Sequence, residues 1–226
     1  MSSSTRSRIA TLRKELLEWG QVNIRDFPWR KKQSPFSILV AEVLLRRTTA
    51  PAVLRIYSSF MNDYGTIEKI LVTDEKQIAK ALQPIGYYKQ RAKILKDISV
   101  YICQKLDGAI PSSKESLLEI PHVGNYTAGA ILSLGYNQAS AMVDTNVKRI
   151  YKRVFLHSLP KRAIDRYIDH LASECVPKDK HQLFNLTLLD LAALICRYGT
   201  PKCQVCPICM VCDYFEDSKQ LKKNAY

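Results

Sequence analysis

The sequence predicts a sharp turn in residues 120–132, which read Ile120-Pro121-His122-Val123-Gly124-Asn125-Tyr126-Thr127-Ala128-Gly129-Ala130-Ile131-Leu132. A helical run ends at Glu119-Ile120, a tight turn with proline and glycine follows, and a second helix starts near Tyr126. This order is the outline of a helix-hairpin-helix, whose second helix begins with free N–H groups that can hold a phosphate oxygen. An ordinary helical hairpin gives the same pattern, so the flanking segments have to distinguish the two.

Apolar residues recur at helical spacing along most of the chain, and alternating runs with hairpin turns are nearly absent. The sequence therefore predicts an all-α fold. No apolar run approaches the roughly 20 residues that cross a bilayer, and no apolar signal region follows the first residues. We expect an intracellular protein without a membrane segment. The predicted helices include residues 7–22, 36–49, 52–64, 68–72, 75–82, 89–106, 126–134, 147–156, 162–174 and 182–196.

The charge of the chain is strongly basic: 34 Lys and Arg against 21 Asp and Glu give a formal net charge of +13. Such a charge attracts polyanions, chiefly nucleic acid or an anionic membrane surface. The basic residues are scattered rather than gathered on one amphipathic helix, which favours nucleic acid. A basic protein with no such partner remains the alternative.

Two carboxylates stand in contrasting surroundings. Glu42 interrupts a run that is otherwise apolar from Ile38 to Leu45, so desolvation should raise its pKa. Asp144 starts a helix, where N–H groups and the helix dipole favour the charged form. Carboxyls pushed apart in this way can serve as acid and anion in catalysis. The alternatives are that Asp144 only caps its helix and that Glu42 pairs with a buried arginine.

Five of the seven cysteines fall between Cys196 and Cys212, and such clustering indicates metal ligation rather than disulfides in a reducing compartment. Four thiolates suit either zinc or a 4Fe-4S cube. One set of four, C-x6-C-x2-C-x5-C, wraps a compact loop and lacks the separated knuckles of a structural zinc site. We predict a 4Fe-4S cluster on this set, which is Cys196, Cys203, Cys206 and Cys212, with Cys209 as a spare thiol. The alternative set of four is evenly spaced: Cys203, Cys206, Cys209 and Cys212.

These motifs in combination resemble the endonuclease III superfamily of base-excision DNA glycosylases, over roughly residues 27–212. The resemblance is greatest to the branch that contains adenine glycosylases acting opposite oxidised guanine and archaeal thymine glycosylases acting on G·T mismatches. The stretches that carry it are Phe27-Pro28-Trp29-Arg30, Ala41-Glu42-Val43-Leu44-Leu45-Arg46-Arg47-Thr48-Thr49-Ala50, Ile85-Gly86-Tyr87-Tyr88 and Val143-Asp144-Thr145-Asn146-Val147-Lys148-Arg149.

The resemblance implies a particular fold. Residues 29–134 would form a six-helix barrel that contains the helix-hairpin-helix. Residues 1–28 and 135–226 would form a second helical domain that holds the 4Fe-4S cluster, with the active cleft between the two. We expect a monomer that acts on double-stranded DNA containing a mismatch, in the cytoplasm of a prokaryote with its chromosome.

The resemblance also implies the site residues. Asp144 would be the catalytic aspartate that stabilises the sugar cation and orients water, and Glu42 would be a carboxyl of the base pocket. Tyr126 stands where strand-cutting members carry a lysine that forms a Schiff base. The sequence therefore predicts a monofunctional glycosylase that leaves an abasic site, unless Tyr126 is only an aromatic packed at a helix start.

Residues for DNA binding follow from the same motifs. Arg47, with Arg46, could hydrogen-bond an orphan guanine through its O6 and N7 atoms. Tyr87 or Tyr88 could wedge into the base stack, or either could be core packing. Lys148 would contact phosphate or lie on a solvated face. In the hairpin, His122 replaces a usual glycine, which puts backbone contacts to phosphate in doubt there and less so at Gly124.

We expect removal of thymine, and of uracil, opposite guanine. The alternative is removal of adenine opposite guanine or 8-oxoguanine. The adenine branch usually has glutamines at the positions of Arg46 and Arg47 and a serine at the position of Tyr126. It also usually has a further C-terminal domain, for which the fourteen residues after Cys212 give no room. A non-catalytic DNA-binding or redox-sensing iron–sulfur protein is a third hypothesis, which the loss of either carboxylate would have favoured.

Overall fold

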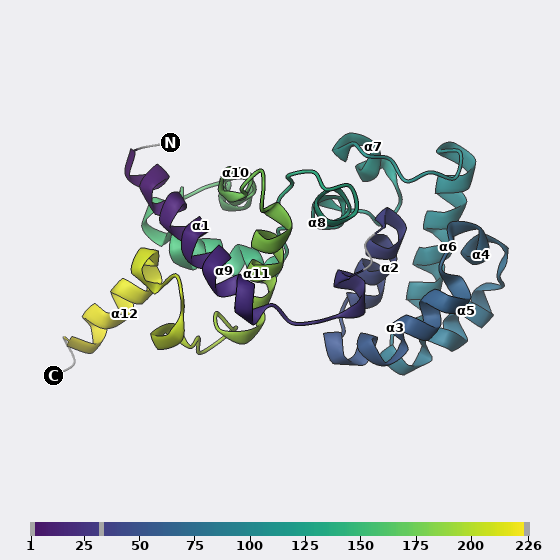
Figure 1. Ribbon diagram of the computed structural model, residues 1–226, viewed down its shortest axis with the longest axis horizontal. Coiled ribbons are helices and arrows are strands. Elements are labelled where there is room, and N and C mark those ends of the chain that lie inside the picture. Colours follow the sequence, from purple (N-terminus) through teal and green to yellow (C-terminus); the bar gives the residue numbers. More distant parts are fainter. Residues whose placement is uncertain (1–2, 32–33, 224–226) are drawn as a thin grey trace. The chain divides into compact units, whose positions relative to one another are not determined.

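The computed structural model describes residues 3–31 and 34–223, and helices are the only regular structure in this part of the chain (Figure 1). The all-α prediction is confirmed. The chain divides into two compact units: residues 26–138 form a central unit, and residues 1–25 with 139–226 form a terminal unit that contains both chain ends. That these units are the predicted barrel and cluster domains, whose boundaries were placed at 28 and 134, remains a prediction.

The central unit is built around α2 (Pro35–Leu45). Ser34 and Ser37 form a capping box at its start, with Pro35 in the first turn, as the Ser-Pro sequence predicts. Most of α2 is buried, and it packs against α3, α6, α8 and the π-helical turn η3. The other helices of this unit are α3 (Ala50–Tyr64), α4 (Ile67–Val72), α5 (Glu75–Leu82), α6 (Tyr88–Lys105), α7 (Lys114–Glu119) and α8 (Asn125–Ala130), with short turns η1 (Pro28–Arg30), η2 (Gln83–Ile85) and η3 (Ile131–Gly135).

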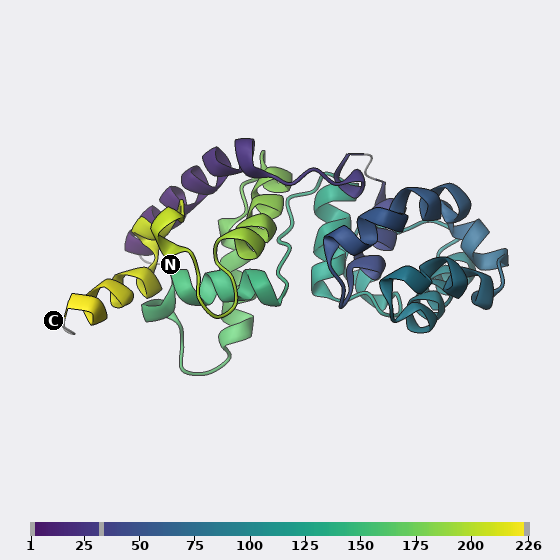
Figure 2. The same cartoon turned by 90° about the horizontal axis from the view of Figure 1, so that it is seen from below.

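The terminal unit packs α1 against α11, with α9 beside α11 and with α10 and α12 against α9. Its core is apolar and includes Leu16, Val147, Phe184 and Leu188, each at most 1% exposed. In Figures 1 and 2, α1 and the start of α12 lie side by side, and Arg8 joins them by an ion pair with Asp213 at 2.7 Å. The helices are α1 (Ser3–Asn23), α9 (Thr145–Val154), α10 (Ile164–Cys175), α11 (His181–Leu194) and α12 (Asp213–Lys223), with short turns η4 (Leu156–Ser158), η5 (Cys203–Val205) and η6 (Cys209–Val211).

One predicted helix end is wrong by four residues. The helix predicted for residues 36–49 ends at Leu45, because Arg46 has extended backbone and Arg47 a left-handed φ of 50°. The helix after the hairpin was predicted to reach residue 134, and the helical stretch does so: α8 ends at Ala130 and continues directly as the π-helix η3, which ends at Gly135. The tail after Cys212, for which no helix was predicted, forms α12. Within the described residues, no helix has the length and apolarity needed to span a membrane.

Candidate active site

The hairpin connects α7 to α8 within the central unit. Gly124 caps α8, and its carbonyl accepts the first helical hydrogen bond, from Ala128 N at 2.9 Å. His122 adopts a left-handed φ of 65°, the conformation that the usual glycine would take without strain. Its ring Nε2 lies 2.9 Å from the Asp97 carboxylate on α6, and this hydrogen bond lowers the pKa of Asp97. The histidine that departs from the motif is therefore tied to a neighbouring helix.

Glu42 and Tyr126 lie together in the central unit. The Tyr126 hydroxyl donates to Glu42 Oε1 at 3.3 Å, which links α2 to the first turn of α8. Both side chains are half-buried, so the predicted burial of Glu42 is only partial. Arg46 is close enough to Glu42 for their charges to interact, although burial is the larger effect and lowers the pKa of Arg46. Glu42 therefore has a cation beside it as well as apolar neighbours.

Arg46 and Arg47 make different contacts. Arg46 Nη2 donates to the carbonyl of His122 at 2.6 Å, so its guanidinium ties the end of α2 to the hairpin. Arg47 is exposed, and its guanidinium carbon lies 5.7 Å from the centre of the Tyr87 ring, within cation–π distance. Tyr87 is 53% exposed and Tyr88 is half-buried. Of the two tyrosines, Tyr87 is the one placed on the surface beside an arginine.

Asp144 lies in the terminal unit and caps α9. Its Oδ1 accepts from the backbone N–H groups of Asn146 at 2.9 Å and Val147 at 2.7 Å, and its Oδ2 accepts from Asn146 Nδ2 at 2.8 Å. Four acceptor positions are available on a carboxylate, so this cap leaves capacity for a further donor. The capping alternative and the catalytic one are thus compatible, because the same carboxyl can do both.

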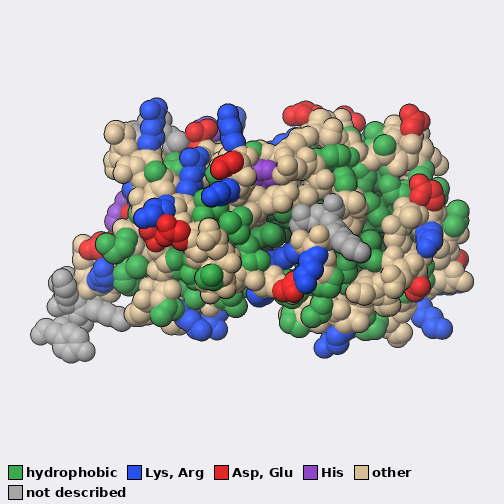
Figure 3. Space-filling model, in the orientation of Figure 1, with side chains coloured by type: hydrophobic (Ala, Val, Ile, Leu, Met, Phe, Trp, Pro, Cys, Tyr) green, Lys and Arg blue, Asp and Glu red, His purple; other side chains and the backbone are tan. Residues whose placement is uncertain are grey.

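A groove of about 960 Å³ in the terminal unit runs past Asp144. Four cations of α9 line it: Lys148, Arg149, Lys152 and Arg153. Lys148 Nζ lies 3.6 Å from Asp165 and 3.9 Å from Asp169, and such partly exposed pairs are worth little. On the face drawn in Figure 3, basic side chains are dispersed among acidic ones, in agreement with the scattered charge of the sequence. The groove is one place in the terminal unit where cations surround a predicted site residue.

The five clustered cysteines line one pocket of the terminal unit, together with apolar residues such as Ile150 and Ile208. The loop that carries them curls beside α9 in Figures 1 and 2, and Arg153 Nη1 lies 3.2 Å from Cys196 Sγ. Burial, with the neighbouring thiols, raises the pKa of Cys206 to about 12 and that of Cys212 to about 11. Within the described residues, no three His, Cys, Asp or Glu side chains are grouped to hold a metal ion.

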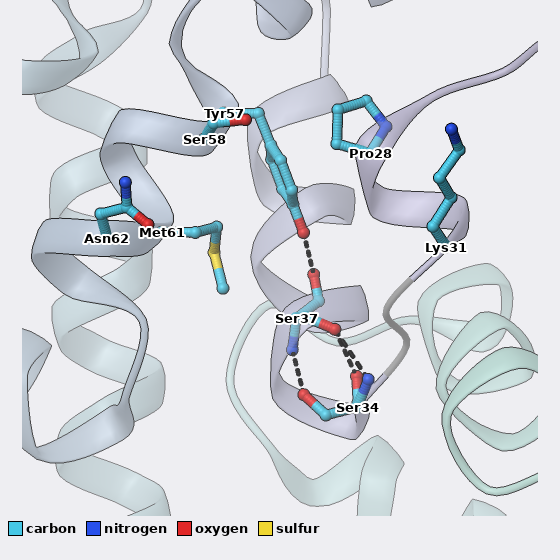
Figure 4. Close-up of a pocket in the computed structure, with 8 residues that line it drawn as sticks. All are labelled: Pro28, Lys31, Ser34, Ser37, Tyr57, Ser58, Met61 and Asn62. Carbon is cyan, nitrogen blue, oxygen red and sulfur yellow. Dashed lines mark hydrogen bonds between the residues drawn. The ribbon is translucent and has the colours of Figure 1, made fainter.

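A second pocket, of about 720 Å³, opens at the start of α2 in the central unit (Figure 4). Ser34 and Ser37, which hydrogen-bond to each other in the capping box, line this pocket. The Tyr57 hydroxyl donates to the Ser37 carbonyl at 3.5 Å. Burial raises the pKa of Tyr57 to about 12. None of the predicted site residues lines this pocket, so the predicted chemistry lies elsewhere.

Two residues that contact predicted site residues were not predicted from the sequence. Asn146 holds the Asp144 carboxylate, and the Asp-x-Asn spacing at a helix start could have indicated it. Asp97 holds the His122 ring, but it is one of several polar residues on an amphipathic helix and carries no local signal.

The hairpin between α7 and α8 in an all-α fold defines a helix-hairpin-helix protein. Residues 40–178 match the model of the HhH-GPD superfamily of base excision DNA repair proteins, and the chain belongs to that family. It is 36% identical over 217 residues to a thymine/uracil-DNA glycosylase of Methanothermobacter thermautotrophicus, covering 96% of this chain and 98% of that protein. The solved structure of a thermostable thymine-DNA glycosylase superposes with a TM-score of 0.89 at 35% identity, over 95% of this chain and all of the other.

The chain is also similar to adenine DNA glycosylases. One from Buchnera aphidicola subsp. Baizongia pistaciae is 28% identical over 200 residues, which are 88% of this chain and 57% of that longer protein. Both branches to which the sequence showed a resemblance are therefore among its relatives. The predicted superfamily and its helical fold are confirmed.

Proposed function

We propose that this chain is a monofunctional DNA glycosylase that removes thymine, and uracil, opposite guanine and leaves an abasic site. The observation that carries the proposal is the hydrogen bond of 3.3 Å between Tyr126 and Glu42 beside the hairpin. A hydroxyl and a carboxyl at that position can bind the carbonyl and imide groups of a pyrimidine, and neither can form a Schiff base. The similarity to thymine and thymine/uracil glycosylases supports the same substrate class.

The reaction breaks the bond between C1′ of the sugar and N1 of the base. Electrons of that bond leave with the base, which is stabilised by hydrogen bonds or a proton from the Tyr126 and Glu42 pair. Asp144 provides negative charge for the oxocarbenium-like sugar and accepts the proton of the water that forms the new C1′–O bond. The base must first leave the stack, which costs less at a mismatch.

The partner would be double-stranded DNA containing a mismatch, bound by a monomer in the cytoplasm with the chromosome. Arg47 would hydrogen-bond the orphan guanine and Tyr87 would fill the vacated space. Lys148 would contact phosphate from the groove beside Asp144. Arg46 and Tyr88 would support these residues, and His122 and Gly124 would place the hairpin against the backbone.

Removal of adenine from mispairs is the second candidate, since adenine glycosylases are among the relatives. Labelled duplexes with G·T, G·U, A·G and A·8-oxoguanine pairs separate the candidates. After incubation, we expect strand scission of the G·T and G·U duplexes only when alkali is added. Release of adenine alone would overturn the proposal in favour of the second candidate. Binding without release from any duplex would indicate a non-catalytic protein.

The cysteine pocket would hold a 4Fe-4S cluster through Cys196, Cys203, Cys206 and Cys212. Five thiols line this apolar pocket and are the donor type that such clusters use, although no three of the described side chains are already grouped to hold a metal ion. The raised pKa values of Cys206 and Cys212 show that burial opposes their charged forms, and bound iron would offset this cost because thiolates are the ligands. When bound, the cluster would brace the loop, and no step of base release depends on it.

The cluster should be lost from one cysteine variant and retained in its matched control. We expect Cys196→Ser to be purified without the broad visible absorbance of an iron–sulfur protein, and Cys209→Ser to keep it, because Cys209 lines the same pocket outside the C-x6-C-x2-C-x5-C set. Iron analysis and absorbance spectra provide the measurement. Loss of colour in Cys209→Ser alone would assign the evenly spaced set of ligands, and colourless zinc-bound wild type would overturn the cluster.

A further inference from the structure

Arg91 is a buried cation on α6, with 2% of its surface exposed. The hydrogen bonds described for its guanidinium go to three backbone carbonyls, those of Ile85 at 3.3 Å, of Gly86 and of Arg46. Its Nε is buried without a hydrogen-bond partner among the described residues. Desolvation of a charge that meets only neutral groups is costly. An apolar side chain would fill the same space at less cost, so the contacts themselves need an explanation.

The three carbonyls lie in two segments that each contain residues with a positive φ. Arg46 directly precedes Arg47, whose φ is 50°, and Gly86, with a φ of 68°, precedes Tyr87, whose φ is 45°. A positive φ is uncommon outside glycine and persists where the surroundings over-determine it. Arg91 spans both segments and constrains them together.

Arg47 and Tyr87 are brought together by these two segments. The guanidinium carbons of Arg47 and Arg91 lie 5.7 and 6.0 Å from the centre of the Tyr87 ring. The ring is therefore within cation–π distance of one exposed and one buried arginine. Arg47 and Tyr87, which are both exposed, would face the orphan base, whereas Arg91 is buried beside them.

We propose that Arg91 is a positioning residue for reading the base opposite the lesion. By joining the carbonyl of Arg46 to those of Ile85 and Gly86, it holds Arg47 and Tyr87 in one fixed arrangement. Lysine cannot replace it, since a single ammonium group lacks the planar fork that reaches two segments at once. The proposal rests on the proposed function in assigning Arg47 and Tyr87 to the opposite strand.

The test measures discrimination between opposite bases without any chemical step. Affinities are measured for duplexes that carry a tetrahydrofuran abasic analogue opposite guanine or opposite adenine. Wild type should prefer guanine, and Arg91→Met and Arg91→Lys should each reduce that preference about ten-fold, as expected for a misplaced bidentate contact. Lys105→Met is the control, because Lys105 is exposed near the other end of α6 and the same charge is removed.

A purely structural role predicts a different outcome. Thermal stability would fall in the Arg91 variants, while the ratio of the two affinities stayed at the wild-type value, and that result would overturn the proposal. If Arg91→Met fails to fold, the affinity ratio of Arg91→Lys distinguishes the two roles. A wild-type protein that does not prefer guanine opposite the abasic analogue would also overturn the proposal. Uracil and thymine release is measured separately on G·U and G·T duplexes, so that failure of the proposed function is seen independently of Arg91.

Discussion

Replacement of Asp144 by asparagine is expected to slow base release by about 10²- to 10⁴-fold and to leave binding of mismatched DNA close to wild type. The substitution removes the negative charge that the cationic sugar and the attacking water need. It should preserve the fold, because an asparagine Oδ1 can still accept from the N–H groups of Asn146 and Val147. Asparagine and aspartate are comparable as helix caps. Single-turnover rates and equilibrium binding on the same G·T duplex measure the two effects.

Asp165→Asn is the matched control. Asp165 lines the same groove as Asp144 and loses the same charge, but its ion pairs are with Lys148 and Lys152, and the N–H groups that cap α9 donate to Asp144. Its base-release rate should remain within a few-fold of wild type, since exposed ion pairs contribute little. Full activity in Asp144→Asn would contradict the assigned mechanism. Equal losses in both variants would indicate that the charge of the groove, rather than Asp144, matters.

Local sequence signals predicted the helix starts well. Ser34-Pro35 and Asp144-Thr145-Asn146 each have side chains that satisfy N–H groups at a helix start, and the structure shows both caps. Those bonds join residues two or three positions apart, so a short stretch of sequence contains all that is needed. The same local signal singled out Asp144 as a candidate site residue.

The end of α2 could not be predicted in the same way. The run through Arg46 and Arg47 continues the helical pattern, yet the helix stops at Leu45. Contacts distant in the sequence decide this: Arg46 donates to the His122 carbonyl, and its own carbonyl accepts from Arg91. The same holds for His122, whose partner Asp97 lies 25 residues earlier in the chain. Long-range hydrogen bonds override the local preference at both positions.

The cysteine ligands show a different limit. Spacing restricted the set to two choices, but all five thiols between Cys196 and Cys212 line one pocket. Proximity therefore does not separate Cys196 from Cys209, and the comparison of these two variants is needed. Spacing along a loop determines which thiols can approach one another, and the bound group selects among them.

Replacement of Tyr126 by lysine is expected to convert simple base release into base release with strand cleavage. A lysine amine in place of the hydroxyl would attack C1′, form a Schiff base with the sugar, and permit elimination of the 3′-phosphate. The G·U duplex should then be cut without alkali, and borohydride should trap a covalent protein–DNA adduct. Wild type and Tyr126→Phe, which lack the amine, should need alkali and give no adduct.

The neighbour of Tyr126 sets the pH dependence of this new activity. Glu42 Oε1 is 3.3 Å from the Tyr126 hydroxyl, so a lysine there would lie beside a carboxyl. A carboxylate favours the charged ammonium and raises the pKa of the amine, whereas the nucleophile is the neutral amine. Scission by Tyr126→Lys should therefore increase as the pH rises, and adding Glu42→Gln should shift that increase to lower pH. If Tyr126→Lys releases uracil at the wild-type rate but never forms the adduct at any pH, position 126 does not face the sugar, and the assignment of Tyr126 to the reaction is wrong.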